Sequence, residues 1–231
     1  MKLYNFWRSG TSHRLRIALN LKGLPVDYLA VHLGKEEHLK DAFKAINPQQ
    51  LVPALVLDGA EAGDGSGSGA SATDGSGSHT LIQSPAIIEW LEERYPSPAL
   101  LPADQLERAQ VRAMAALVGC DIHPVNNRRI LEYLRKQFGA DEAVINAWCG
   151  TWIAAGFDAL EALIYSPASE VRYCFGNTPT VADVYLIPQV ESARRFKVDQ
   201  TRWPKIMAIA AHCATLAAFA DAAPARQPDA A

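Results

Sequence analysis

The sequence lacks a long hydrophobic run, and no part of it has the pattern of a secretion signal. No apolar stretch reaches the length that spans a bilayer, and the N-terminal MKLYNFWRSG turns polar and basic after a few apolar residues. The chain also lacks an excess of charge of one sign, since 22 basic residues face 25 acidic ones, for a net charge of -3. Neither a membrane nor a nucleic acid is therefore an expected partner, and we expect a cytoplasmic protein.

Cysteine is scarce, and its spacing excludes two classes of site. The four cysteines, Cys120, Cys149, Cys174 and Cys213, lie far apart and form no C-x-x-C pair. Structural zinc sites and disulfide-rich domains usually show closely spaced cysteines. The sequence therefore predicts no metal site and no disulfide framework, and the four thiols are expected to be free and buried.

The chain is long enough for two small domains, and its patterning changes along the way. With 231 residues and 49% apolar content it can bury a substantial core. Residues 1–97 alternate strand-like and helix-like segments, whereas residues 103–222 show helical patterning alone. The sequence predicts an α/β domain followed by an all-α domain, with residues 223–231 as a disordered tail.

Seven elements are expected in the first domain. In chain order they are a strand, a helix, a strand, a helix, two strands and a helix: Lys2–Phe6, Leu15–Lys22, Pro25–Ala30, Glu36–Ile46, Leu51–Leu57, Leu81–Ile82 and a helix with Ser84 as N-cap and Pro85 at its first position. The first strand–helix–strand unit implies a parallel pair of strands. Pro53 lacks an N–H inside its strand, which requires an edge position, a bulge or a cis peptide bond.

A Gly/Ser-rich stretch interrupts this domain. Residues 59–80 contain GDGSGSGASATDGSGS, which has too few apolar groups to order itself. We expect a flexible loop, and because it carries no anchoring side chains we interpret it as a neutral insertion or a linker rather than a lid.

The second domain is expected to hold three long helices. The first covers about Leu106 to Lys136 and is interrupted at Asp121–Pro124, because proline disfavours a helical residue before it. The next covers Glu142–Ile164. The last begins at Thr180, with Asp183 three residues on, which is the spacing of a capping box.

The first cluster of candidate functional residues lies between the first strand and the first helix. Arg8-Ser9-Gly10-Thr11-Ser12-His13-Arg14 places hydroxyl groups at a helix N-terminus, where free N–H groups and the helix dipole favour an anion. A thiolate suits this position, since these features lower the pKa of a thiol. Plain helix capping by one of these hydroxyls explains the pattern equally well.

The second cluster combines Val52-Pro53 with Gln83-Ser84. If Pro53 is cis, the backbone of Val52 points outward, where its N–H and C=O can pair with a peptide-like ligand. Gln83 and Ser84 lie at another helix N-terminus and can hold a carboxylate and an amino group.

Several segments of the sequence resemble those of a known family. The segments FWRSGTSHRLRIALNLKGLPVDY, LVPAL, IQSPAIIEWLEERYP and NTPTVADVYLIPQVESARRF resemble the zeta-class glutathione transferases over nearly the whole chain. The resemblance implies the glutathione S-transferase fold, a thioredoxin-like N-terminal domain plus an all-helical one, in a homodimer that binds glutathione. Within the class it is closest to the maleylpyruvate isomerases, with the maleylacetoacetate isomerases as near neighbours.

The resemblance also assigns residues. Zeta-class proteins usually read Ser-Ser-Cys where this chain reads Ser9-Gly10-Thr11, so Ser9 and Thr11 are implied to stabilise the thiolate without a protein cysteine. Val52 is implied to pair with the cysteinyl backbone of glutathione. The remaining implied glutathione contacts are His38, Gln49, Gln83, Ser84, Asp121, Ile122, His123, Asn127 and Arg128, some of them reaching the tripeptide of the partner subunit.

The implied reaction is a cis–trans isomerisation of a small unsaturated diacid. Thiolate addition turns the double bond into a single bond that can rotate, and thiolate expulsion restores it, so no metal or redox cofactor is needed. Positive charge must stabilise two carboxylates, and arginine binds them in bidentate fashion. We expect Arg8 and Arg195 to do so, with Arg128 as a third candidate. For Arg195 the alternative is a solvated helix face, and for His123, a possible proton donor, a structural hydrogen bond beside Pro124.

Three functions remain open on the sequence. A transferase or dehalogenase acting on electrophilic xenobiotics would favour an apolar pocket, whereas the arginines favour a dianionic substrate. A noncatalytic glutathione-binding protein would not need the Ser9–Thr11 pair. Maleylpyruvate and maleylacetoacetate differ only in their acyl group, which the sequence does not distinguish.

Overall fold

The computed structural model describes residues 1–59, 78–165 and 171–230. They form two compact units, one of Met1–Pro98 together with the C-terminal segment from Asp221, the other of Ala99–Ala220. Most of the predicted Gly/Ser-rich loop, residues 60–77, lies outside the described part of the chain. Among the helices that are described, none combines the length and the hydropathy needed to cross a bilayer.

The first unit is built on a four-stranded mixed sheet. Its strands are β1 (Lys2–Asn5), β2 (Asp27–Ala30), β3 (Ala54–Leu57) and β4 (His79–Ile82), in the spatial order β2-β1-β3-β4. β1 and β2 are parallel, as the sequence predicts, while β3 runs antiparallel to β1 and β4. All four residues of β3 are buried, which matches its continuous apolar run.

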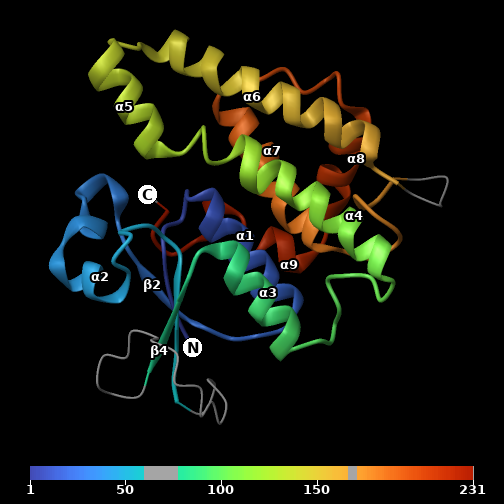
Figure 1. The fold of residues 1–231 in the computed structure, drawn as a ribbon, viewed down its shortest axis with the longest axis horizontal. Coiled ribbons are helices and arrows are strands. Elements are labelled where there is room, and N and C mark those ends of the chain that lie inside the picture. Colours follow the sequence, from blue (N-terminus) through green and yellow to red (C-terminus); the bar gives the residue numbers. More distant parts are fainter. Residues whose placement is uncertain (60–77, 166–170, 231) are drawn as a thin grey trace. The chain divides into compact units, whose positions relative to one another are not determined.

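Two helices lie side by side on one face of this sheet, and a shorter one lies on the other face (Figure 1). The pair is α1 (Gly10–Leu21) and α3 (Ser84–Arg94), and the third is α2 (Asp41–Ile46). α1 ends where predicted, because Gly23 takes a left-handed φ of 65°. The expected helix from Glu36 is wrong in its first half, which forms the 3₁₀ turn η2 (Glu37–Leu39) and is preceded by another such turn, η1 (Leu33–Lys35).

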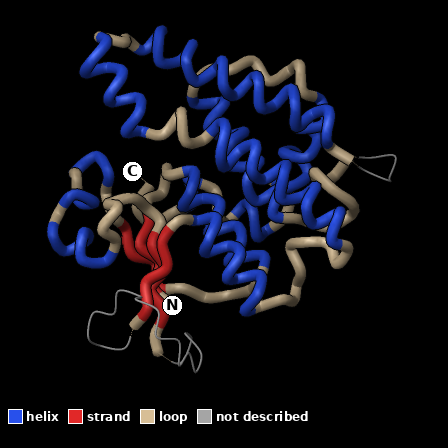
Figure 2. Tube along the Cα trace, in the orientation of Figure 1, coloured by secondary structure: helices blue, strands red, loops and turns tan. Residues whose placement is uncertain are grey.

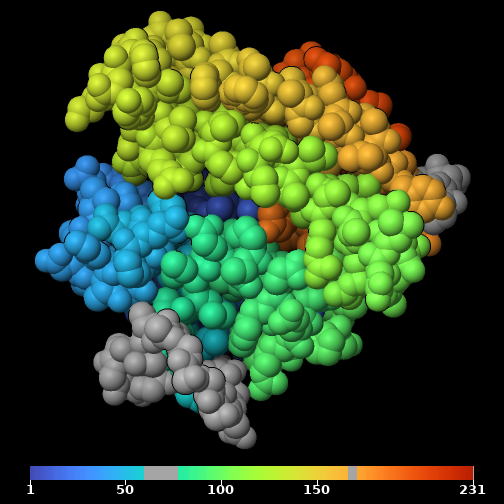
Figure 3. Space-filling view, viewed as in Figure 1, coloured from blue at the N-terminus to red at the C-terminus, as the bar shows by residue number. Residues whose placement is uncertain are grey.

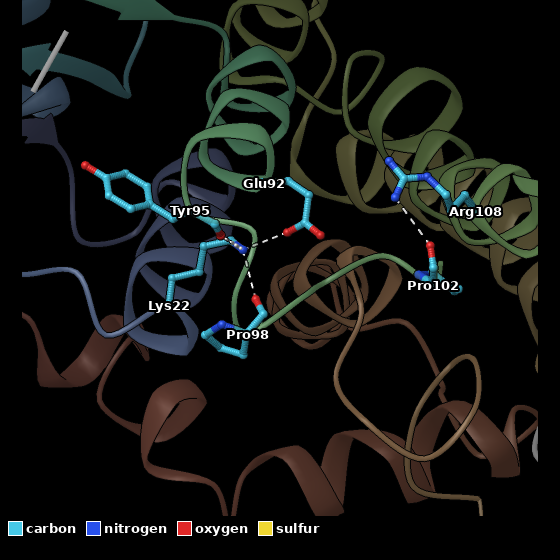
Figure 4. Close-up of polar contacts among 6 residues, drawn as sticks. All are labelled: Lys22, Glu92, Tyr95, Pro98, Pro102 and Arg108. Carbon is cyan, nitrogen blue, oxygen red and sulfur yellow. Dashed lines mark hydrogen bonds and ion pairs between the residues drawn. The ribbon is translucent and has the colours of Figure 1, made fainter. Parts of the chain in front are cut away.

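A buried lysine joins the C-terminal ends of α1 and α3 (Figure 4). The Lys22 ammonium, with no exposed side-chain surface, lies 2.7 Å from the Glu92 carboxylate. It also donates to the carbonyls of Tyr95 (2.6 Å) and Pro98 (2.9 Å). These three acceptors match its three N–H donors, so the charge is buried but fully satisfied.

The second unit is helical in its described residues (Figure 2), apart from one isolated bridge between Tyr165 and Phe175. Its elements are α4 (Gln105–Ala116), the π-helical turn η3 (Leu117–Ile122), α5 (Arg128–Phe138), α6 (Glu142–Leu163), α7 (Val181–Arg195), α8 (Pro204–Cys213) and α9 (Ala217–Ala220). The predicted interruption before Pro124 is confirmed, since helix geometry stops after η3 and resumes at Arg128. π-helical turns often occur at functional sites.

The start of α7 is held by the predicted capping box. The buried Asp183 carboxylate accepts from the Thr180 backbone N–H (2.8 Å) and the Thr180 hydroxyl (3.0 Å). It also accepts from the N–H of Cys174 (2.7 Å), which ties the preceding segment to the helix. Burial raises the pKa of Asp183 above its ordinary value, and these hydrogen bonds act against that shift.

The C-terminal tail differs from expectation. Residues 223–230 are ordered: Pro224–Arg226 form the short 3₁₀ turn η4, and Gln227 is buried. The Gln227 amide donates to the carbonyls of Asp221 (2.7 Å) and Ala223 (2.9 Å). The prediction of a disordered tail is therefore wrong, because Asp229 in this segment also bonds to Trp7 and Tyr28, which lie far away in the sequence.

Candidate functional site

The hydroxyls of Ser9 and Thr11, at the start of α1, form a hydrogen-bonded chain with the Val52 carbonyl in the loop before β3. Ser9 is the N-cap of α1, and its oxygen accepts from the Ser12 N–H at 3.3 Å. Thr11 Oγ1 donates to the Val52 carbonyl at 2.9 Å and lies 2.9 Å from Ser9 Oγ. A hydroxyl has only one proton, so the proton between Ser9 and Thr11 must come from Ser9. Thr11 is thereby committed to Val52, and Ser9 carries the proton that can turn toward a ligand.

The surroundings of this chain favour an anion. Ser9 and Thr11 are half-buried, and the first turn of α1 holds no acidic residue that would offset the helix dipole. Arg8 is exposed, with its guanidinium carbon 5.5 Å from the centroid of the Trp7 ring. Plain capping and anion binding are thus compatible, since Ser9 caps the helix with its oxygen and keeps its proton.

His13, on the same helix, contributes no positive charge. It is 4% exposed, and burial first, then the charge of Arg16, lowers its pKa from 6.5 to about 3. The imidazole is therefore neutral near neutral pH. The positive potential at the start of α1 comes from the helix and from Arg8, not from this histidine.

The second predicted cluster gathers at the start of α3. Gln83, not Ser84, is the N-cap, and it has a left-handed φ of 67°. Its amide donates to Gln49 Oε1 at 2.6 Å, so two of the predicted residues meet on the exposed surface. Ser84 is the first residue of the helix and is buried, with its hydroxyl 3.5 Å from Arg14 Nη1. A buried guanidinium therefore lies beneath this helix N-terminus.

Val52 and His38 occupy the loops beside this cluster. The Val52–Pro53 bond is cis, one of the three possibilities the sequence left open. The Val52 carbonyl already accepts from Thr11, but a carbonyl has two lone pairs and can accept a second hydrogen bond. His38 lies half-buried in η2.

The remaining predicted residues lie in the helical unit, and their environments differ. Ile122 is fully buried against α6, where a Cβ on Gly156 would stand 2.2 Å from its Cδ1. Asn127 caps α5 by accepting from the Arg129 N–H at 3.2 Å, and Arg128 forms an ion pair with Glu132. Only Leu131 of α5 is buried, and Figure 3 shows this helix on the surface of the face in view.

Asp121, His123 and Arg195 are at least partly accessible in that unit. Asp121 is exposed and His123 is half-buried at the end of η3. Arg195, the last residue of α7, is exposed, with its guanidinium carbon 4.7 Å from the centroid of the Phe196 ring. Its Nη2 lies 3.4 Å from Ser192 Oγ, which is a long hydrogen bond.

The helical unit also contains a cavity of about 720 Å³ that none of these residues lines. Its wall is formed by Val171, Arg172, Pro204, Lys205, Ala208 and His212. The Lys205 ammonium is held by the carbonyls of Glu161 (3.0 Å) and Ile164 (3.5 Å). The start of α8 at Pro204 lines this cavity, but none of its lining residues among the described ones carries a hydroxyl.

Comparison with known proteins gives concordant results. Residues 3–99 match the family described as glutathione S-transferase, N-terminal domain. A maleylpyruvate isomerase from Ralstonia sp is 69% identical over 231 residues, which is 100% of both chains. The holo structure of a maleyl pyruvate isomerase, described as a bacterial glutathione S-transferase in the zeta class, covers 100% of both chains with a TM-score of 0.88 and 69% identity.

The chain belongs to the zeta class of the glutathione S-transferase family.

A more distant zeta-class relative is also informative. The maleylacetoacetate isomerase from Anaeromyxobacter dehalogenans 2CP-1, with bound dicarboxyethyl glutathione and citrate in the active site, is 39% identical with a TM-score of 0.82. The alignment covers 100% of this chain and 93% of that one. The fold predicted from the sequence, a thioredoxin-like domain followed by a helical one, is confirmed.

The residues of this zeta-class transferase suit a tripeptide with a thiol and two carboxylates. Two helix N-termini, those of α1 and α3, lack acidic residues in their first turns. Each carries neutral donors, the Ser9 and Thr11 hydroxyls at one and the Gln49–Gln83 amide pair at the other. Neutral donors at a helix N-terminus bind anions, so the donor set fits glutathione.

The sequence reading missed the arginines buried behind this set. Arg14 and Arg16 are 2% and 5% exposed, although they flank apolar residues in RLRIALNL. Two charged residues inside an apolar helical pattern indicate that the charges are buried, and buried charges need partners elsewhere in the fold. Asp229, which also reaches this region, gives no local signal.

Proposed function

We propose that this zeta-class transferase is a glutathione-dependent cis–trans isomerase that converts maleylpyruvate to fumarylpyruvate. The observation that carries the proposal is the Ser9–Thr11–Val52 hydrogen-bonded chain at the N-terminus of α1, with bonds of 2.9 Å. It leaves one hydroxyl proton, on Ser9, able to turn toward an anion without breaking the tie to Val52. The 69% identity to the Ralstonia maleylpyruvate isomerase, against 48% over the same 231 residues to a maleylacetoacetate isomerase, favours maleylpyruvate.

Bound glutathione would supply the thiolate whose reversible addition lets the substrate's double bond rotate. Ser9 donates its proton to the sulfur, and the α1 N-terminus adds the favourable dipole. Thr11 keeps its hydrogen bond to the Val52 carbonyl when Ser9 turns its proton toward the sulfur. Val52 pairs with the peptide backbone, and Gln49, Gln83 and Ser84, with the Arg14 charge behind them, receive the charged ends.

We extend the same proposal to the other predicted glutathione contacts. In this role they are His38, Asp121, Ile122, His123, Asn127 and Arg128. Ile122 is fully buried and packs against Gly156 of α6. Asn127 and Arg128 would keep their helix-capping and ion-pairing roles beside ligand binding.

Arginine provides the charge that a dianionic substrate needs. We assign Arg8 and Arg195 to the two carboxylates, because both are exposed and each guanidinium lies over a neighbouring aromatic ring in a cation–π contact. A guanidinium can exchange such a contact for a bidentate bond to a carboxylate. Stabilising the charge that develops on the substrate during addition is the largest contribution that these residues can make.

We further propose that the enzyme is a homodimer and works in the cytoplasm. The dimer is implied by the zeta-class resemblance. A reducing compartment agrees with four free cysteines, three of them buried. Burial raises the pKa of the Cys149 thiol to about 11, so this cysteine does not compete with glutathione as a nucleophile.

The test is to follow the loss of absorbance of maleylpyruvate and of maleylacetoacetate, each with and without glutathione. We expect isomerisation to require glutathione, with the larger kcat/KM for maleylpyruvate. Equal rates with and without glutathione would refute the proposal. The second candidate, a transferase of electrophilic xenobiotics, predicts instead a stable glutathione conjugate with a chlorinated aromatic acceptor and no turnover of either diacid.

A further inference from the structure

The C-terminal segment returns to the loop that carries the candidate site. This loop, residues 6–9, connects β1 to α1 and contains Arg8 and Ser9. Asp229 lies more than two hundred positions further along the chain, yet its carboxylate accepts from the Trp7 backbone N–H at 3.1 Å. The other carboxylate oxygen accepts from the hydroxyl of Tyr28 on β2. Both oxygens of Asp229 are therefore used within the first unit.

Arg16 holds the same loop from the interior. Its guanidinium donates to the carbonyl of Trp7 at 3.0 Å, to the side chain of Asn5 at 3.0 Å and to the carbonyl of Phe6 at 3.5 Å. Its Nε donates to the carbonyl of Ala222, in the C-terminal segment, at 3.0 Å. Arg16 is 5% exposed, and hydrogen bonds from a buried charged donor are stronger than neutral ones.

The peptide groups of Trp7 are thus held on both sides by ionised partners. Asp229 takes its N–H and Arg16 its C=O, and the next two residues are Arg8 and Ser9. The Ser9 N–H in turn donates to the Phe6 carbonyl at 3.0 Å, which also faces Arg16. The position of the Ser9 hydroxyl therefore depends on a network that reaches the end of the described chain.

We propose that Asp229, Tyr28 and Arg16 are positioning residues that fix the 6–9 loop for activation of the glutathione thiol. The inference rests on the proposed function, because it concerns the same Ser9. A donor held in place before the ligand arrives needs no reorganisation when charge develops. None of the three contacts the substrate in this account, and they act through the Trp7 backbone.

The charges behind this network are consistent with a fixed arrangement. Burial lowers the pKa of Arg16 to about 10, an effect that the neighbouring Tyr28 and Asp229 oppose, so the guanidinium stays protonated at neutral pH. Burial and the hydrogen bond to Asp229 raise the pKa of Tyr28, so its hydroxyl keeps the proton that it donates.

The experiment uses Asp229→Asn and Tyr28→Phe in the full-length protein, with Asp221→Asn as the matched control. Asp221 lies in the same segment, is exposed and pairs with Arg226 on the surface at 2.9 Å. Three readouts are compared: hydrogen exchange of the Trp7 amide in the glutathione-free protein, the pKa of the bound glutathione thiol from its ultraviolet absorbance, and kcat/KM for maleylpyruvate.

We expect Asp229→Asn to speed Trp7 amide exchange at least tenfold, to raise the thiol pKa by roughly half to one unit and to lower kcat/KM about 10- to 100-fold, since small misplacements of catalytic groups have effects of this size. Tyr28→Phe should act in the same direction with a smaller effect. The double variant should be little worse than Asp229→Asn alone, because the two residues share one network. Asp221→Asn should change the Trp7 exchange rate and kcat/KM by less than about twofold and should leave the thiol pKa nearly unchanged, as exposed ion pairs contribute little.

The outcomes separate this inference from the proposed function. A thiol pKa and a Trp7 exchange rate unchanged in Asp229→Asn would overturn the inference, and so would equal effects in Asp221→Asn. If the wild-type protein shows no isomerase activity, the proposed function fails, but the exchange rate and the thiol pKa still decide the role of Asp229.

Discussion

Replacing the two hydroxyls at the start of α1 one at a time should separate their roles. Ser9→Ala removes the only proton that is able to turn toward a thiolate. A hydrogen bond to a charged group contributes about 1.5 to 3 kcal/mol, and one pKa unit corresponds to about 1.4 kcal/mol, so the pKa of bound glutathione should rise by about 1 to 2 units. The same change removes the helix cap, which costs about 1 kcal/mol of stability.

Thr11→Val is the matched comparison, because valine keeps the branched shape and removes only the hydroxyl. The partly buried carbonyl of Val52 then loses its donor at 2.9 Å, which should cost about 0.5 to 1.5 kcal/mol of stability. Ser9 keeps its proton, so the thiol pKa should move by less than about half a unit. Both variants therefore lose comparable stability, and only one loses thiol activation.

The assay is a pH titration of the thiolate absorbance of bound glutathione, with urea unfolding measured on the same samples. The acidic limb of the pH profile of kcat/KM, where the thiol of glutathione loses its proton, should shift by the same amount. The reasoning is refuted if Thr11→Val raises the thiol pKa as much as Ser9→Ala does. That result would mean that Thr11, not Ser9, donates to the sulfur.

Three further predictions concern other parts of the chain. Arg195→Ala should raise KM or lower kcat for the diacid about tenfold or more while glutathione affinity changes little, and isothermal titration calorimetry showing lost glutathione affinity would contradict its assignment. Lys22→Met should lower the free energy of unfolding in urea by about 3 to 5 kcal/mol, because it removes the ammonium that pairs with the buried Glu92 carboxylate, and a second change of Glu92 to Leu should recover part of the loss. The depressed pKa of His13, about 3 in the folded state, means that the unfolded chain takes up this proton first as pH falls below 6.5. Stability should therefore decrease as the pH falls from about 6.5 to 3, and His13→Gln should flatten this dependence in calorimetric scans. Parallel curves for the two proteins would contradict the prediction.

Much of the local structure follows from the sequence because its causes are local. The glycine stop of α1, the Thr180–Asp183 capping box and the break before Pro124 each depend on residues within one turn of one another. Such patterns need no knowledge of the rest of the fold. The same holds for the parallel pairing of β1 and β2, which follows from their connection by one helix.

The parts that the sequence did not predict depend on distant partners. Asp229 is ordered by Trp7 and Tyr28, and Lys22 by carbonyls that follow α3, so neither contact leaves a local pattern. The boundary at α3 is off by one residue because Gln83 adopts a left-handed φ of 67°, an uncommon choice for a residue other than glycine. The first half of the helix expected from Glu36 is wrong for a similar reason, since Glu36, its first expected residue, has a φ of 55°.

The candidate site was predictable as a set of residue types and not as a hydrogen-bonding arrangement. Ser9, Thr11 and Val52 were each expected near a thiol, but the direction of the protons follows only from the 2.9 Å bond between Thr11 and the Val52 carbonyl. The contact between Gln49 and Gln83 likewise joins two predicted residues that lie 34 positions apart.

We expect the sulfur of glutathione to add to the double bond of the substrate, while the chain binds and activates this sulfur. The most direct test replaces glutathione by γ-glutamyl-seryl-glycine, which keeps both carboxylates and the peptide backbone but has a hydroxyl in place of the thiol. The account predicts that this analogue competes with glutathione for binding and supports no isomerisation of maleylpyruvate. Isomerisation that continues at saturating analogue, with no glutathione present, would contradict it.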